Sequence, residues 1–225
     1  MAIPYLFGPV GFISEVLYTM IVVLFCFLIY FKTKEMYDLT KYKGIQYFRN
    51  AFLFFGLAYL CRFVIQITQL TNIASGFGFD IGHPRRMVFP LFMLVVSYLS
   101  TMALFYLTYS TSWKRFKYTS FMILSNAVAI CLALVSFIFR SPFILSILQL
   151  LLLLTAFIII VKQHKQSKKT AITKFLYFLI LIFWLLNILV LDSRWFFPFE
   201  YKIIFQVISI GVFIAIYYKV KKWIK

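Results

Sequence analysis

The sequence predicts an all-α integral membrane protein: a bundle of seven transmembrane helices with its N-terminus outside and its C-terminus in the cytoplasm. Of the 225 residues, 64% are hydrophobic and only 13% are charged, which is more apolar surface than one soluble core of this size buries. Long apolar stretches alternate with short polar or basic separators. The strongly basic separators fall on every second connection, as they do in proteins that cross a membrane repeatedly.

Seven stretches are long enough to cross a bilayer, which takes roughly 20 apolar residues per helix. In chain order they are about 9–31, 46–70, 87–110, 117–139, 142–161, 173–191 and 200–218. Prolines mark three of the starts: Pro90 in the first turn of the third stretch, Pro142 at the start of the fifth and Pro198 just before the seventh. We expect one seven-helix membrane domain, residues 1–225, in the cell (plasma) membrane.

The basic residues orient this bundle. Most of the 23 Lys and Arg residues follow the first, third, fifth and seventh stretches, and positive charge marks the cytoplasmic side. The net charge of +17 is therefore explained by topology and by contact with anionic lipid at the cytoplasmic face, so we expect no nucleic-acid partner. The first basic segment, 32–49, mixes lysine with tyrosine and predicts an amphipathic helical extension against the headgroups.

The motifs of common enzyme and cofactor sites do not occur. The sequence contains no HExxH, GxGxxG, P-loop or GxSxG pattern. Its two histidines, His83 and His164, fall in predicted loops on opposite sides of the membrane, which does not make a zinc site. A retinal-binding photoreceptor requires a lysine deep in the seventh helix, whereas Lys202 is expected at the outer rim. We therefore expect no enzyme, no metal site and no cofactor.

Arg62 is the main candidate for a functional residue. It lies about 11 residues in from Asn50, at the cytoplasmic end of the second stretch, and is therefore roughly 17 Å deep, near mid-membrane, where an ionisable side chain costs about 2.5–3.5 kcal/mol to insert. Helical spacing places it on one face with Phe55, Tyr59, Gln66 and Gln69. Glu15, in the first stretch, is the expected counter-charge and lies slightly nearer the outside.

The remaining polar residues within the helices fall mainly in the outer half of the bundle. With Arg62 and Glu15, the candidate ligand-binding or ion-pathway residues are Tyr59, Gln66, Gln69, Gln149, Asn187, Gln206 and Ser209. The predicted outer loops add Asp80, His83, Arg85, Arg86, Asp192, Arg194, Trp195 and Glu200. Since the inner halves are almost entirely Phe, Leu, Ile and Val, the pattern indicates a polar site above an apolar floor. A structural Glu15–Arg62 pair with hydrogen bonds between helices fits the same residues.

Three functions fit this pattern. The first is a sensory or receptor-type protein that binds a small ligand in the outer half. We expect no output domain after Lys225, so such a protein would signal through a separate cytoplasmic partner. Its overall plan is similar to the seven-helix sensor regions of bacterial receptors. The second is a small-solute transporter or ion pathway gated by the Arg62–Glu15 pair. The third is an accessory or scaffold subunit whose polar face meets another membrane protein.

Overall fold

The computed structural model describes residues 9–74, 85–114, 117–139, 142–163, 169–191 and 199–224, and these ranges are helical almost throughout. Their seven helices are α1 (Pro9–Thr40), α2 (Lys43–Ala74), α3 (Arg85–Ser112), α4 (Tyr118–Phe139), α5 (Pro142–Gln163), α6 (Lys169–Leu191) and α8 (Phe199–Ile224). The predicted all-helical architecture is confirmed. Each helix coincides with one apolar stretch of the sequence, extended at most by a few turns.

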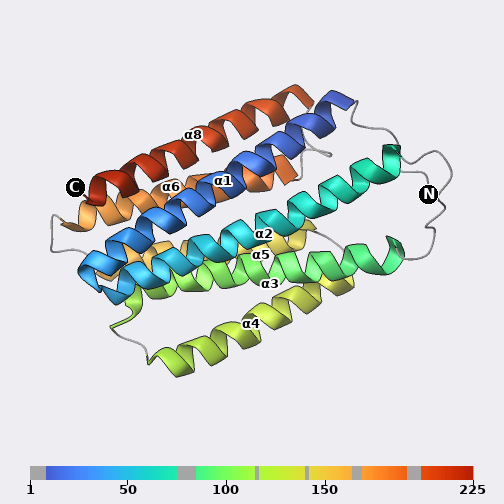
Figure 1. The fold of residues 1–225 in the computed structure, drawn as a ribbon. Helices are drawn as coiled ribbons and strands as arrows, with labels where there is room; N and C mark the ends of the chain where they lie inside the picture. The colour runs from blue at the N-terminus through green and yellow to red at the C-terminus, as the bar shows by residue number, and fades with distance from the viewer. Residues whose placement is uncertain are drawn as a thin grey trace.

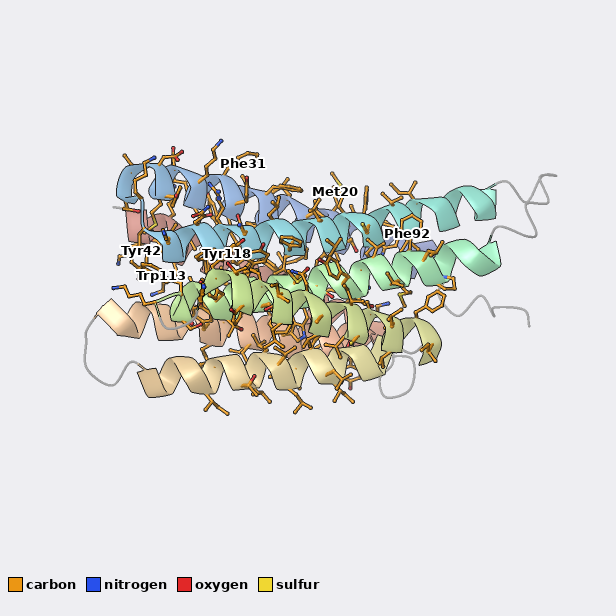
Figure 2. All side chains as sticks on the ribbon, turned by 90° about the horizontal axis from the view of Figure 1, so that it is seen from below. Met20, Phe31, Tyr42, Phe92, Trp113 and Tyr118 are labelled. Carbon is orange, nitrogen blue, oxygen red and sulfur yellow. The ribbon has the colours of Figure 1, made fainter. Side chains whose placement is uncertain are left out.

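Five of the described helices, α1, α2, α3, α4 and α8, are long and apolar enough to cross a membrane. In α5 and α6 the described side chains cover only part of each helix, and within that part the apolar stretches are Ser146–Thr155 and Phe175–Asn187. Large apolar side chains cover the outer faces: Met20 and Phe31 project from α1 with 54% and 61% of their surface exposed (Figure 2). Lipid solvates such side chains and water does not. The chain is a multi-pass membrane protein.

Six of the helices close into a ring (Figure 1). Helix α1 packs against α2 and α8, α2 against α3, α3 against α5, α5 against α6, and α6 against α8. Helix α4 lies outside this ring and packs against α3 and α5. The first and last helices of the chain are therefore neighbours, and this brings residues far apart in the sequence to one place.

A tight turn joins α1 to α2. Lys41 has a φ of 51°, and its amide donates a hydrogen bond of 2.7 Å to the carbonyl of Tyr37. This left-handed residue with a bond back to the last turn is a common way for a helix to end. Residues 32–49, predicted as a helical extension, form the end of α1 and the start of α2, interrupted by this turn. The two helices continue as one antiparallel pair beyond their apolar parts.

Aromatic side chains fasten this end of the bundle. The guanidinium carbon of Arg49 lies 5.5 Å from the ring centre of Tyr30 and 5.4 Å from that of Tyr37, so α2 is held to α1 by cation–π contacts. Tyr42 meets Trp113 at the end of α3 edge-to-face, with ring centres 5.6 Å apart. Figure 2 shows Tyr42 and Trp113 together at this end of the molecule.

Helix α3 begins earlier than predicted. Because it starts at Arg85, Pro90 lies in its second turn and not in its first. Proline has no amide hydrogen, so the bond that residue 90 would give to the carbonyl of residue 86 is missing.

Aromatic rings fill the centre of the bundle between α2, α6 and α8. Phe183 of α6 meets Phe213 of α8 with ring centres 4.3 Å apart, and Phe55 of α2 meets Trp184 at 5.0 Å. All four are buried, with at most 6% of their surface exposed. The predicted apolar floor is therefore an aromatic cluster shared by α2, α6 and α8.

Gly44 provides a test of the packing between α2 and α3. A Cβ atom at this position would lie 2.9 Å from the backbone oxygen of Ser110 and 2.6 Å from a ring carbon of Tyr42. We expect Gly44→Ala to destabilise the fold by about 1–3 kcal/mol through overpacking. Gly211→Ala is the matched control, since a Cβ there meets nothing within 4 Å. It should stabilise α8 by about 0.5–1 kcal/mol. The melting temperatures of both variants in detergent micelles measure these effects. Equal changes for the two variants would contradict the close packing at Gly44.

Candidate functional site

Three charged side chains from three helices meet at the end of the bundle where α1 and α8 begin. The Nη2 atom of Arg62 in α2 lies 3.0 Å from Oε1 of Glu15 in α1, and the predicted Glu15–Arg62 contact is confirmed. The Nζ atom of Lys202 in α8 lies 3.3 Å from the same oxygen. Two cations therefore contact the same carboxylate oxygen of Glu15. We call these three residues the ionic cluster.

Lys202 was not among the predicted site residues. It lies in the first turn of α8, and only 5% of its side chain is exposed, against 18% for Arg62 and 24% for Glu15. Its place follows from the ring of helices, because α8 packs directly against α1. A signal existed in the sequence: Lys202 precedes Gln206 by four residues and Ser209 by seven, so all three share one helix face.

A layer of hydrogen bonds lies directly below the ionic cluster. The Tyr59 hydroxyl donates to Oδ1 of Asn187 at 2.5 Å, and the Tyr18 hydroxyl donates to the same atom at 3.3 Å. The Tyr18 hydroxyl also lies 2.9 Å from Oγ of Ser209. These four side chains come from α2, α6, α1 and α8, and each is at least nine-tenths buried. We call them the tyrosine layer; Tyr18 is its one member that the sequence analysis missed.

Helix geometry stacks the tyrosine layer on the ionic cluster. Glu15 and Tyr18 are three residues apart, as are Tyr59 and Arg62, so each pair is separated by about 4.5 Å along its helix. Residues at this spacing lie on the same helix face. The two groups therefore form one continuous polar column between α1, α2, α6 and α8, with the aromatic cluster beneath it.

Two glutamines line this column. Gln66 lies one helical turn from Arg62 on the side away from Tyr59, and Gln206 lies one turn from Lys202 on the side toward Ser209, with 6% and 3% of their surface exposed. Within the described residues, Oε1 of Gln66 and Nε2 of Gln206 have no hydrogen-bond partner. A buried polar atom left unpaired costs about 1–3 kcal/mol, so these two amides mark places where a water or ligand atom would be stabilised.

Gln149 does not belong to this column. Its Nε2 atom donates to Oγ of Ser100 at 2.7 Å and to Oγ1 of Thr101 at 3.1 Å, which joins α5 to α3. Between α3 and α4 there are two further contacts: Tyr98 donates to Asn126 at 2.6 Å and Ser97 to Ser136 at 3.0 Å. The sequence analysis placed Gln149 in the same candidate set as Arg62, whereas its described contacts are those of a bond between helices.

Other predicted residues fall outside the described side chains. This applies to Gln69, although its backbone is part of α2, and to the outer residues Asp80, His83, Arg85, Arg86, Asp192, Arg194, Trp195 and Glu200. Among the side chains that the structure describes, no three His, Cys, Asp or Glu residues gather as a metal site would require. The ionic cluster has instead the chemistry of charge recognition, with two cations and one carboxylate.

One comparison with known proteins covers nearly the whole chain. An uncharacterized protein of Archaeoglobus fulgidus is 35% identical over 224 residues, which cover 97% of this chain and 96% of the relative. The similarity therefore extends over all the described helices, including the four that build the polar column. No protein-family model matches the chain. No solved structure matches it either.

The ionic cluster predicts an order of stabilities. Arg62→Gln leaves Glu15 beside Lys202, whereas Glu15→Gln leaves two cations facing each other. We expect Glu15→Gln to lower the free energy of unfolding by about 2 kcal/mol or more. This is less than the loss for a fully buried pair, because part of the cluster is exposed. Arg62→Gln should lower the free energy of unfolding by a smaller amount than Glu15→Gln. Unfolding free energies in micelles measure both. A larger loss for Arg62→Gln would show that Lys202 does not hold Glu15.

The tyrosine layer predicts a smaller effect. Tyr59→Phe removes the hydroxyl that donates to Asn187, so the buried Oδ1 of Asn187 keeps only the longer bond from Tyr18. We expect the free energy of unfolding to fall by about 1–2 kcal/mol. Tyr218→Phe is the matched control, because that side chain is 64% exposed. Its melting temperature should equal that of the original chain. Equal values for the two variants would mean that the Tyr59 hydroxyl contributes nothing.

Proposed function

We propose that this chain, which belongs to one family with the Archaeoglobus fulgidus protein, is a sensory or receptor-type membrane protein that binds a small ligand at the polar column. The observation that carries the proposal is the polar column itself. One carboxylate contacts two cations, and two buried glutamines beside them carry unpaired polar atoms within the described residues. A purely structural pair of charges requires neither feature.

The proposal includes a topology in which all seven helices cross the membrane with the N-terminus outside. Its support is the distribution of charge. The turn between α1 and α2, the end of α3 and the end of α8 lie at one end of the bundle, and basic residues are concentrated there (Figure 1). Positive charge marks the cytoplasmic side. The polar column then lies in the outer half, within reach of molecules outside the cell, and the membrane is the plasma membrane.

Signalling follows from the helices that the column joins. A ligand at the ionic cluster changes the contacts of α1, α2 and α8, and the tyrosine layer connects the same helices to α6. All four continue to the basic inner end. We propose that a separate cytoplasmic protein reads the arrangement of these helix ends, and that anionic lipid headgroups contact their lysines.

A small-solute transporter or ion pathway is the second candidate. The observation that favours it is the shared carboxylate, because Glu15 contacts cations from two different helices and its release from one would open a path between them. An accessory or scaffold subunit is the third, and predicts that the purified chain is unstable without a partner. Both alternatives use the same polar column, the transporter to pass a solute or ion and the scaffold to contact another membrane protein.

A ligand screen tests the receptor proposal. The full chain in lipid nanodiscs is heated with a panel of anionic, neutral and cationic small molecules. We expect at least one member to raise the melting temperature of the original chain but not of Arg62→Gln; a ligand at 100 times its Kd stabilises by about 2.7 kcal/mol. Arg49→Gln is the control, since it removes an arginine of the same helix at the other end.

The alternatives give different results in the same preparation. In liposomes, uptake of the stabilising molecule that is abolished by Arg62→Gln would establish the transporter and exclude a receptor that only binds. If no member of the panel acts through Arg62, the ligand site does not exist and the receptor proposal is rejected.

A further inference from the structure

The two contacts of Glu15 assign a chemical class to the ligand. We infer that the site takes a singly charged oxyanion, such as a small monocarboxylate, which replaces Glu15 at Arg62 while Glu15 stays paired with Lys202. This inference rests on the proposed function and adds the ligand's charge and the way it changes the site.

The first step is that the exchange leaves no charge unpaired. Both cations contact the same oxygen of Glu15, Arg62 at 3.0 Å and Lys202 at 3.3 Å. An anion that binds Arg62 therefore releases Glu15 from one partner and not from both. Breaking an isolated buried pair is strongly unfavourable because one ion is left alone. Here the carboxylate keeps its contact with Lys202, and Arg62 gains a new one.

The second step is that Arg62 is the more accessible cation. Its side chain is 18% exposed, and that of Lys202 is 5% exposed. A guanidinium has five N–H donors, and the described contact of Arg62 to Glu15 uses Nη2. Its flat fork matches the two oxygens of a carboxylate, which it binds with two parallel hydrogen bonds. An entering anion therefore meets Arg62 first and in a favourable geometry.

The third step concerns the buried amides. Nε2 of Gln206 is a hydrogen-bond donor without a partner among the described residues, and Gln206 lies one turn along α8 from Lys202. An oxyanion accepts a hydrogen bond from a donor such as Nε2 of Gln206. The unpaired atom of Gln66, one turn along α2 from Arg62, is the acceptor Oε1, so Gln66 does not supply this donor. A cationic ligand would instead be repelled by two positive side chains.

The oxyanion has two possible sources, and the experiment separates them. Propionate, propionamide and propylamine share a three-carbon chain and carry a negative, no and a positive charge. Each is titrated against the full chain in phosphatidylcholine nanodiscs at pH 7, with sodium chloride added to equalise ionic strength, and the melting temperature gives an apparent Kd. A second series in phosphatidylglycerol nanodiscs offers a singly charged phosphodiester from the lipid itself.

We expect propionate to stabilise the chain and the other two to have no effect. Arg62→Gln should abolish the response. Glu15→Gln should lower the apparent Kd about tenfold, because the competing carboxylate is gone, and Lys202→Gln should raise it about tenfold, because Glu15 then has only Arg62. Tighter binding on loss of Glu15 is a result that a merely structural ion pair does not give. If Glu15→Gln does not fold, Glu15→Asp replaces it and should also tighten binding.

The outcomes decide between the claims. Stabilisation by phosphatidylglycerol and not by propionate, with the same pattern among the variants, supports the oxyanion and identifies the lipid headgroup as its source. Stabilisation through Arg62 by propionamide or propylamine alone overturns the oxyanion and leaves the proposed receptor intact. Weaker propionate binding to the Glu15 variants would also overturn it, because Glu15 would then belong to the binding site and not compete with the ligand.

Discussion

The carboxylate of Glu15 is the constraint around which one end of the bundle is arranged. A charge inside a membrane helix is tolerated only where partners are supplied from neighbouring helices. Glu15 obtains two, from α2 and from α8, so α1 has to lie between them. The tyrosine layer then follows, since residues three positions from Glu15 and Arg62 necessarily face the same interior. The contacts that Glu15 requires are therefore made by the two helices that flank α1 in the ring.

Hydrogen bonds and aromatic packing divide the bundle by depth. Without a hydrophobic driving force between helices in lipid, association depends on close packing and on polar contacts. Around Phe183 the packing uses aromatic rings, and around Glu15 it uses charges, hydroxyls and amides. Hydrogen bonds through Gln149 and Asn126 join α3, α4 and α5 separately from the polar column. The column is therefore confined to four helices, and this confinement distinguishes a candidate site from general interhelical contacts.

The sequence predicts this fold well because the period of apolar residues and the requirement for about 20 of them per crossing are local properties. The Glu15–Arg62 contact was also predictable, since these are oppositely charged residues in consecutive helices. Lys202 was left out of the predicted site because position along a helix does not reveal that α8 packs against α1. Gln149 was grouped with Arg62 for the same reason: hydropathy does not say which helices are neighbours. The turn at Lys41 was missed because no glycine signals it.

The unbroken pair of α1 and α2 has a mechanical consequence. From Arg62 to the start of α2 at Lys43 the helix runs 19 residues, or about 29 Å at 1.5 Å per residue. A rod of that length, joined to α1 by a turn of two residues, behaves as a lever. A tilt of about 3° about Arg62 moves the end at Lys43 by roughly 1.5 Å, comparable to the helix shifts that switch other proteins. The tip that moves is Lys41–Tyr42, beside Trp113.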